Sequence, residues 1–123
     1  MSCDVCIGHD PDDGVVEELS EAQVTARKPH KCYECHRPIP TGTDYQKFVG
    51  KWEGKLVTYR TCLLCVEVRK VFTCGEGWTW GTLWEDMAEL AFPQLTTATE
   101  CFRELSPAAK KFVLDNWQRW KGL

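Results

Sequence analysis

The hydrophobic pattern in the middle of the chain predicts a β-hairpin. In residues 44–51, the side chains of Tyr45, Lys47 and Val49 alternate with those of Gln46, Phe48 and Gly50. This period of two is typical of a strand. Residues 56–60 are rich in β-branched and aromatic side chains, which also favour a strand. Glu53 and Gly54 between the two runs suit a tight turn, so we expect two antiparallel strands joined there.

Helical patterns follow this hairpin. Thr61 is a candidate N-cap for a helix over 62–72, where apolar side chains recur at helical spacing. Thr82 and Glu85 have the spacing of a capping box. They predict a second, short helix that ends near Phe92-Pro93.

The C-terminal residues predict a longer helix. Residues 97–105 indicate a weak helical segment, whereas Ser106 followed by Pro107 is a strong helix start. From there to the end of the chain the pattern is that of a basic amphipathic helix. Its apolar stripe consists of Phe112, Val113, Trp117 and Trp120.

Cysteine spacing adds a chemical constraint to this pattern. Six of the eight cysteines form three Cys-x2-Cys pairs, a spacing that lets two thiolates from one turn reach the same tetrahedral ion. The pairs Cys32/Cys35 and Cys62/Cys65 flank the predicted hairpin, so we expect one four-cysteine zinc site. Four thiolates leave no open position for water, which predicts a structural ion.

The order of elements predicts a fold class. A knuckle, a hairpin and a helix that starts at the second cysteine pair follow one another in a treble-clef zinc fold. We therefore predict an α+β protein with a small treble-clef-like zinc module and C-terminal helices. The expected divisions are an acidic N-terminal arm with a cysteine pair over 1–26, the zinc module over 27–75, and a helical part packed on it over 76–123.

The N-terminal cysteine pair indicates a second zinc site. Its candidate ligands are Cys3, Cys6 and Cys74, with His30 or His9 as the fourth. The alternative is an N-terminal arm whose thiols bind nothing. Cys101 is expected to be a small buried side chain. The chain is thus predicted to hold one zinc ion, or two if this site forms.

Composition indicates a folded protein. Hydrophobic residues make up 43% of the chain and aromatic residues 11%, which is too much for a disordered sequence. No apolar run approaches the roughly 20 residues that span a bilayer, and the first residues lack the features of a signal peptide. We expect a cytoplasmic protein whose thiols stay reduced, which favours metal over disulfides.

The net charge of −3 conceals a strong segregation. Residues 1–26 contain seven acidic and no Lys or Arg residues, whereas 27–60 contain eight basic and three acidic ones. The basic segment either faces a phosphate or acidic partner, or offsets the formal −2 of zinc with four thiolates. Candidate partner-binding residues are Lys47, Lys51 and Lys55 of the hairpin and Trp78 and Trp80 of a glycine/tryptophan loop.

Two readings of the tryptophans remain open. Trp78 and Trp80 either pack the C-terminal helices onto the zinc module or, if exposed, anchor a partner. Motifs of zinc proteases, deaminases, phosphate loops and serine hydrolases are absent from the sequence. We therefore expect no enzymatic activity.

Three motifs carry a resemblance to a known group of proteins. The runs 27–35, 50–54 and 59–65, the last two around Trp52 and the second cysteine pair, resemble small zinc-binding proteins encoded by phages and prophages. The resemblance covers roughly residues 3 to 90 and implies a protein of a bacterial host's cytoplasm, without naming an activity. Phage proteins of this kind often bind a host or phage machine, and they include anti-CRISPR inhibitors of host defence.

Two functional hypotheses follow. The first is a non-enzymatic phage zinc protein that acts by protein–protein contact and inhibits a host nucleic-acid-processing or defence complex, with the acidic arm mimicking nucleic acid. The alternative is a zinc module that binds DNA or RNA directly through the basic hairpin of residues 27–60. Neither hypothesis involves a membrane.

Overall fold

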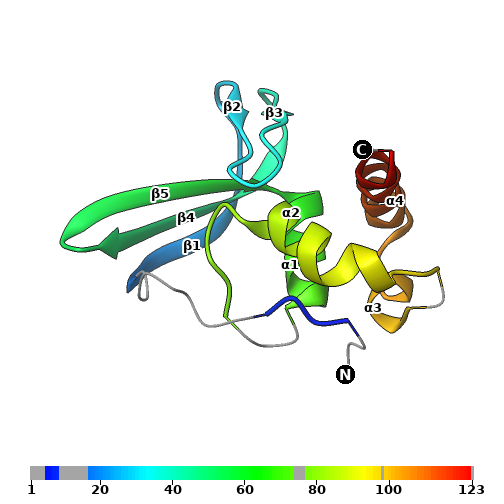
Figure 1. Cartoon of the computed structure of the whole chain (residues 1–123). Helices are drawn as coiled ribbons and strands as arrows, with labels where there is room; N and C mark the ends of the chain where they lie inside the picture. The colour runs from blue at the N-terminus through cyan, green and yellow to red at the C-terminus, as the bar shows by residue number, and fades with distance from the viewer. Residues whose placement is uncertain (1–4, 9–16, 74–76, 98, 123) are drawn as a thin grey trace.

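The computed structural model describes residues 5–8, 17–73, 77–97 and 99–122. Two antiparallel sheets lie beside a group of helices, so this part of the chain has a mixed α+β fold (Figure 1). The larger sheet has the strand order β1-β4-β5, with β1 at Glu17–Thr25, β4 at Asp44–Trp52 and β5 at Lys55–Cys62. The smaller sheet pairs β2 (His30–Lys31) with β3 (Pro38–Ile39) and rises above the larger one (Figure 1).

The predicted hairpin is confirmed as strands β4 and β5. Their register runs from Tyr45 opposite Cys62 to Trp52 opposite Lys55, which leaves a two-residue turn. Both turn residues have positive φ, 51° at Glu53 and 79° at Gly54, as a type I′ turn requires. This turn matches the right-handed twist of the strands, so the local sequence sets the register.

Residues 17–25 of the expected acidic arm form strand β1 instead. The strand pairs with nearly all of β4, from Glu17 opposite Lys51 to Thr25 opposite Asp44. Most of its side chains are exposed, so no alternation of apolar and polar residues marks it in the sequence. The backbone ladder with β4 holds it, supported by the Thr25 hydroxyl, which donates to the Asp44 carboxylate at 2.6 Å.

Helices fill the rest of the described chain. They are α1 (Leu63–Phe72), α2 (Leu83–Asp86), the π turn η1 (Met87–Ala91), the 3-10 turn η2 (Phe92–Gln94), α3 (Glu100–Arg103) and α4 (Pro107–Lys121). The predicted start of α4 is confirmed, since the Ser106 side chain accepts from the Ala109 N–H at 3.2 Å. None of these described helices is both long and apolar enough to cross a bilayer.

One of the two predicted N-caps is wrong, and the other is right in position but not in its hydrogen bond. Thr61 lies in β5 with its side chain fully buried, and the N-cap of α1 is Cys62. Thr82 is the N-cap residue of α2, but its hydroxyl donates to the Thr79 carbonyl and the Asp86 carboxylate rather than capping an N–H. A long-range acceptor, described below, takes the first N–H of α2. A local motif cannot indicate such an acceptor.

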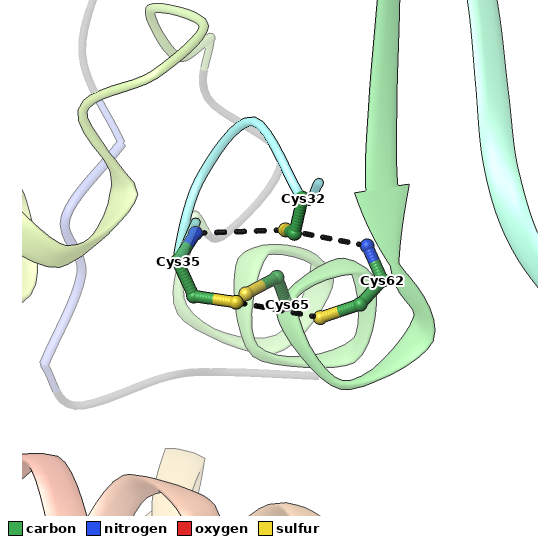
Figure 2. Close-up of side chains that lie close together, drawn as sticks. All are labelled: Cys32, Cys35, Cys62 and Cys65. Atoms are coloured by element: carbon green, nitrogen blue, oxygen red, sulfur yellow. Dashed lines mark hydrogen bonds between the residues drawn. The ribbon is translucent and has the colours of Figure 1, made fainter. Parts of the chain in front are cut away.

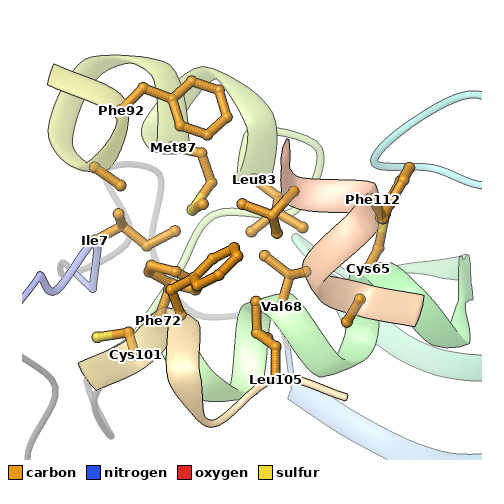
Figure 3. Close-up of a cluster of buried hydrophobic side chains, with 14 of the residues drawn as sticks. Ile7, Cys65, Val68, Phe72, Leu83, Met87, Phe92, Cys101, Leu105 and Phe112 are labelled. Carbon is orange, nitrogen blue, oxygen red and sulfur yellow. The ribbon is translucent and has the colours of Figure 1, made fainter. Parts of the chain in front are cut away.

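The hydrophobic core lies where the helices meet under the sheet (Figure 3). Phe72 and Val68 of α1 are fully buried and face Met87 of the π turn. Ile7 packs into the same core and donates its N–H to the Phe72 carbonyl at 2.9 Å. Val5 and Ile7 thus belong to the core, which their polar surroundings in the sequence did not indicate.

Candidate metal centre

Four cysteine side chains from two segments converge at the junction of the sheets and α1 (Figure 2). Cys32 and Cys35 lie in the loop between β2 and β3, while Cys62 ends β5 and Cys65 lies in the first turn of α1. All four Sγ atoms lie within 4.8 Å of one another. The predicted four-cysteine group is therefore formed, and it could hold a metal ion.

The spacing of the sulfurs fits tetrahedral coordination. Zinc–sulfur bonds of about 2.3 Å place adjacent sulfurs of a tetrahedron about 3.8 Å apart. The Sγ atoms of Cys35 and Cys62 are 3.8 Å apart, and all four thiols are free rather than disulfide-bonded. Cys32 and Cys65 are fully buried, whereas Cys35 and Cys62 are partly exposed. An ion here would be enclosed on one side and close to solvent on the other.

A tight knuckle positions the first pair. The His36 N–H donates to the Cys32 carbonyl at 2.9 Å, and His36 itself has a φ of 62°, in the left-handed region. This turn aims the Cys35 N–H at the Cys32 sulfur at 3.5 Å, and the Cys62 N–H reaches the same sulfur at 3.3 Å. Such N–H···S contacts favour the thiolate form that binds metal.

Electrostatics show why these sulfurs need a cation. The hydrogen bond with Cys35 raises the pKa of Cys32, but those from Cys62 and Cys65 outweigh it and hold that pKa at about 6. Hydrogen bonds with the other three cysteines also hold the pKa of Cys35 below its usual value. The hydrogen bonds that Cys65 makes with the same group instead raise the pKa of Cys65. Four sulfurs this close cannot all be thiolates without a positive charge between them.

Two side chains outside the cysteine group contact it. The indole N–H of Trp84 on α2 donates to the Cys65 sulfur at 3.4 Å. Burial lowers the pKa of Arg37, but interactions with Cys35 and Cys62 outweigh burial and raise it. Arg37 therefore offsets part of the charge of the cysteines. Burial lowers the pKa of Arg69, whereas nearby negative charges, including those of Cys65 and Cys32, act to raise it, so Arg69 offsets part of the charge as well. Sequence analysis assigned that role to the basic segment as a whole.

Glu34, between the two knuckle cysteines, connects the knuckle to α2. Its side chain is fully buried, and its carboxylate accepts from the N–H groups of Gly81 at 3.0 Å and Leu83 at 3.1 Å. Burial raises its pKa, while these two N–H donors lower it. Sequence reasoning counted Glu34 only as a charge. The signal in the sequence was an acidic residue placed between the two cysteines of the knuckle.

Arg69 of α1 completes this buried network. Its guanidinium lies 3.6 Å from the Glu34 carboxylate and donates to the Gln46 side chain at 2.7 Å. The same guanidinium is 4.9 Å from the ring centroid of Trp78 and 4.7 Å from that of Trp80. A cation held between two indoles in this way fixes the glycine/tryptophan loop over α1.

The two candidate tryptophan anchors differ in their surroundings. Trp80 stacks on Tyr59 of β5, with ring centroids 4.5 Å apart and planes at 6°, and also packs on Phe48. Trp78 is 36% exposed and meets Trp80 edge to face. Both tryptophans therefore help to hold the loop on the sheet and α1. A partner-anchoring role stays a prediction.

The second predicted zinc site is not assembled by the described residues. Cys6 is exposed, and the His30 ring packs against Tyr45 with centroids 5.6 Å apart. Cys101 is fully buried as expected, but it is disulfide-bonded, which sequence analysis did not anticipate. Cys3, His9 and Cys74 lie outside the described residues, so this site stays a prediction.

The three candidate lysines are distributed along the hairpin. Lys47 lies opposite Arg60 in the middle of the sheet, and Lys51 lies opposite Leu56 nearer the turn. Lys55 follows the turn and is exposed. The structure thus places one of the three, Lys47, in a charged cross-strand pair that the sequence did not reveal.

Comparisons of this chain with protein-family profiles, curated proteins and solved structures find no match.

Proposed function

We propose that the four cysteines bind one structural Zn²⁺ and that the chain is a non-enzymatic binding protein. The donor set supports zinc, since four thiolates at tetrahedral spacing are typical of structural zinc sites. The order of knuckle, hairpin and helix supports a treble-clef-like module. A closed shell of four sulfurs offers no position for a reactive water.

Metal analysis tests this first step. Elemental analysis of protein purified without added metal should give one zinc per chain at the cysteine group. Cobalt substitution should give the absorption of a fully thiolate-ligated tetrahedral ion. A cobalt spectrum that requires a nitrogen or water ligand would overturn the closed site, and with it the argument against catalysis. A second equivalent of zinc would support the predicted second site.

We further propose that this protein binds the phosphate backbone of nucleic acid through the sheet face that carries Lys47 and Arg60. These two side chains lie directly opposite each other on neighbouring strands, and the β1 residue beside Lys47 is Ala22. Like charges in this position destabilise a sheet unless an anion binds them. This cross-strand pair is the observation that carries the proposal.

Neighbouring residues extend the positive surface. The His30 pKa is lowered first by burial and then by the charges of Arg60, Lys28 and Lys47, so all three cations lie close to one imidazole. The Nε atom of Arg60 is buried without a hydrogen-bond partner among the described residues. Within the described part of the chain, no ion pair joins any of these three cations to a carboxylate, which supports phosphate as their partner.

Salt-dependent binding tests the proposal. Three phosphate contacts predict a slope of about −3 for log affinity against log salt with duplex DNA. The Lys47→Glu/Arg60→Glu variant should bind at least about tenfold more weakly, with a smaller slope. The control is Lys110→Glu/Lys111→Glu, which makes the same charge change on α4. Equal weakening by both variants would show that net charge alone matters and would overturn the proposed face.

Protein–protein contact is a second candidate, favoured by two exposed leucines. Leu56 near the hairpin turn is 69% exposed and Leu19 of β1 is 50% exposed. Both leucines lie beside the second half of β4. Leu56 of β5 is opposite Lys51, and Leu19 of β1 comes just before Ser20, which is opposite Val49. We infer that these two leucines contribute to one apolar patch, since contiguous exposed apolar patches mark protein interaction sites.

Pull-down from nuclease-treated bacterial lysate tests this candidate. The native chain should retain a specific host or phage protein, such as a component of a defence complex. The Leu19→Ser/Leu56→Ser variant should lose that protein while it keeps its zinc and its fold. Recovery of the same proteins by both forms would overturn a role for these leucines.

A further inference from the structure

A cleft of about 280 Å³ lies beside the cysteine group, between the knuckle, the start of α2 and the middle of α4. Its volume is close to the lower end of the roughly 300–1,000 Å³ of small-ligand pockets. The rings of Trp84 and Phe112 line it and meet edge to face, with centroids 5.1 Å apart. The cleft therefore combines an aromatic wall with polar side chains from distant segments.

Two guanidinium groups from segments far apart in the sequence line this cleft, Arg37 from the knuckle and Arg119 from α4. Arg37 lies over the Phe112 ring at 4.1 Å. Arg119 donates to the Asn116 side chain at 3.1 Å, and Asn116 in turn donates to the Phe112 carbonyl at 2.8 Å. Both arginines are exposed at the cleft, and each contacts a residue that lines it.

Arg119 shares the cleft with the carboxylate of Glu85 but does not form an ion pair with it. No ion pair joins Arg37 or Arg119 to a carboxylate within the described residues. Glu85 contributes the exposed carboxylate of the cleft, and the oxygens of Glu34 already accept from Gly81 and Leu83.

We infer that this cleft binds a small organic carboxylate. Its carboxylate is bound by Arg119, with Arg37 as the second donor, and its apolar body packs against Phe112 and Trp84. An arginine fork matches a carboxylate in geometry and charge, and such charge-assisted hydrogen bonds are among the stronger polar contacts. This site is separate from the proposed nucleic-acid face and does not depend on it.

Titration followed by nuclear magnetic resonance tests the inference on the zinc-loaded full chain. The reporter is the indole N–H of Trp84, which lines the cleft. The probes are benzoate and N-acetylphenylalanine, and the control ligands are the corresponding neutral amides, titrated in the same way. Saturable binding of the acids at millimolar concentration is expected, with at least about fivefold weaker binding of the amides. Tighter binding of N-acetylphenylalanine would identify a peptide chain end as the source of the carboxylate, and tighter binding of benzoate a free small acid.

Arg119→Gln should weaken binding about tenfold, the loss expected for one charge-assisted hydrogen bond. The matched control is Lys111→Gln, the same charge change at an exposed position of the same helix. Unchanged zinc content shows that Arg119→Gln leaves the metal centre intact. Absence of binding up to 10 mM, equal binding of acids and amides, or less than a twofold effect of Arg119→Gln would each overturn the inference.

Discussion

The carboxylate of Glu34 accepts a hydrogen bond from the backbone N–H of Leu83 at 3.1 Å, across 49 residues of sequence. Glu34 lies between Cys32 and Cys35, and Leu83 is the first residue of α2. A residue of the knuckle therefore caps the helix that carries Trp84, which donates to Cys65 in return. The four-cysteine group and the C-terminal helices are connected through these two contacts.

Loss of metal should unfold most of the chain. Structural zinc contributes on the order of 10 kcal/mol in small zinc domains, which exceeds the stability of most domains. We expect Cys62→Ser, or treatment with a strong chelator, to abolish the cooperative thermal transition followed by circular dichroism.

The control for this prediction is Cys6→Ser, which removes an exposed thiol outside the four-cysteine group. It should leave the melting temperature within about 2 °C of the native value, as expected for a surface substitution. An unaltered transition in Cys62→Ser would contradict a structural metal at this site.

Glu34→Gln should destabilise the chain by about 2–4 kcal/mol, because it leaves the buried Arg69 guanidinium without its countercharge. Urea unfolding of the zinc-loaded protein measures the free energy. The control is Glu85→Gln, the same change at an exposed position. Arg69→Met in the Glu34→Gln background should cost less than the same change in the native chain. Additive effects of the two substitutions would contradict coupling.

Gly81→Ala should destabilise the chain more than Gly42→Ala. The two glycines have nearly the same φ, 90° and 89°, so both substitutions introduce the same backbone strain of about 1 kcal/mol. An added Cβ at Gly81 would lie 2.8 Å from the Tyr33 ring, whereas at Gly42 it meets nothing within 4 Å. The difference between the two unfolding free energies measures the contact with Tyr33. Equal losses of unfolding free energy in the two variants would show that backbone strain alone accounts for the destabilisation.

A pair of carboxylates on β1 predicts a pH effect. The irregularity between Glu18 and Ser20 brings Glu18 and Glu21 to one face of the strand, opposite Gly50 and Phe48. The hydrogen bond with Glu21, then burial and the charge of Glu21, raise the pKa of Glu18 above its usual 4.5. The folded state therefore binds this proton more tightly than the unfolded state does.

The sign of the effect follows from linkage. A carboxyl whose pKa is raised by folding loses stability as the pH rises from 4.5 to its folded pKa. Glu21→Gln should return the Glu18 pKa toward 4.5 and reduce this loss. Carbon-detected titration of the Glu18 carboxyl measures the shift, with Glu17→Gln as the control. An unchanged Glu18 pKa in Glu21→Gln would contradict the pairing.

Local patterns predicted the elements whose stability is local. The turn at Glu53 and Gly54 and the cap at Ser106 both depend on neighbours within a few residues, and both were found in the sequence. Strand β1 was missed because most of its side chains are exposed on both faces, so its ladder with β4 defines it. The N-cap position of α2, Thr82, was predicted correctly, but the side chain that accepts from its first N–H was missed because Glu34 is distant in sequence.

The sequence by itself determined the four-cysteine group, because paired cysteines on either side of a hairpin return to one place once that hairpin forms. It also determined the concentration of positive charge in residues 27–60. Only the tertiary structure decided which of these cations lies near the cysteines and which lie on the sheet. Arg37 lies beside the sulfurs, and Lys47 and Arg60 lie opposite each other on the sheet. The positions of these cations depend on the strand register and on the path of the chain, because both bring residues together that are distant in sequence. Local sequence patterns do not encode such contacts.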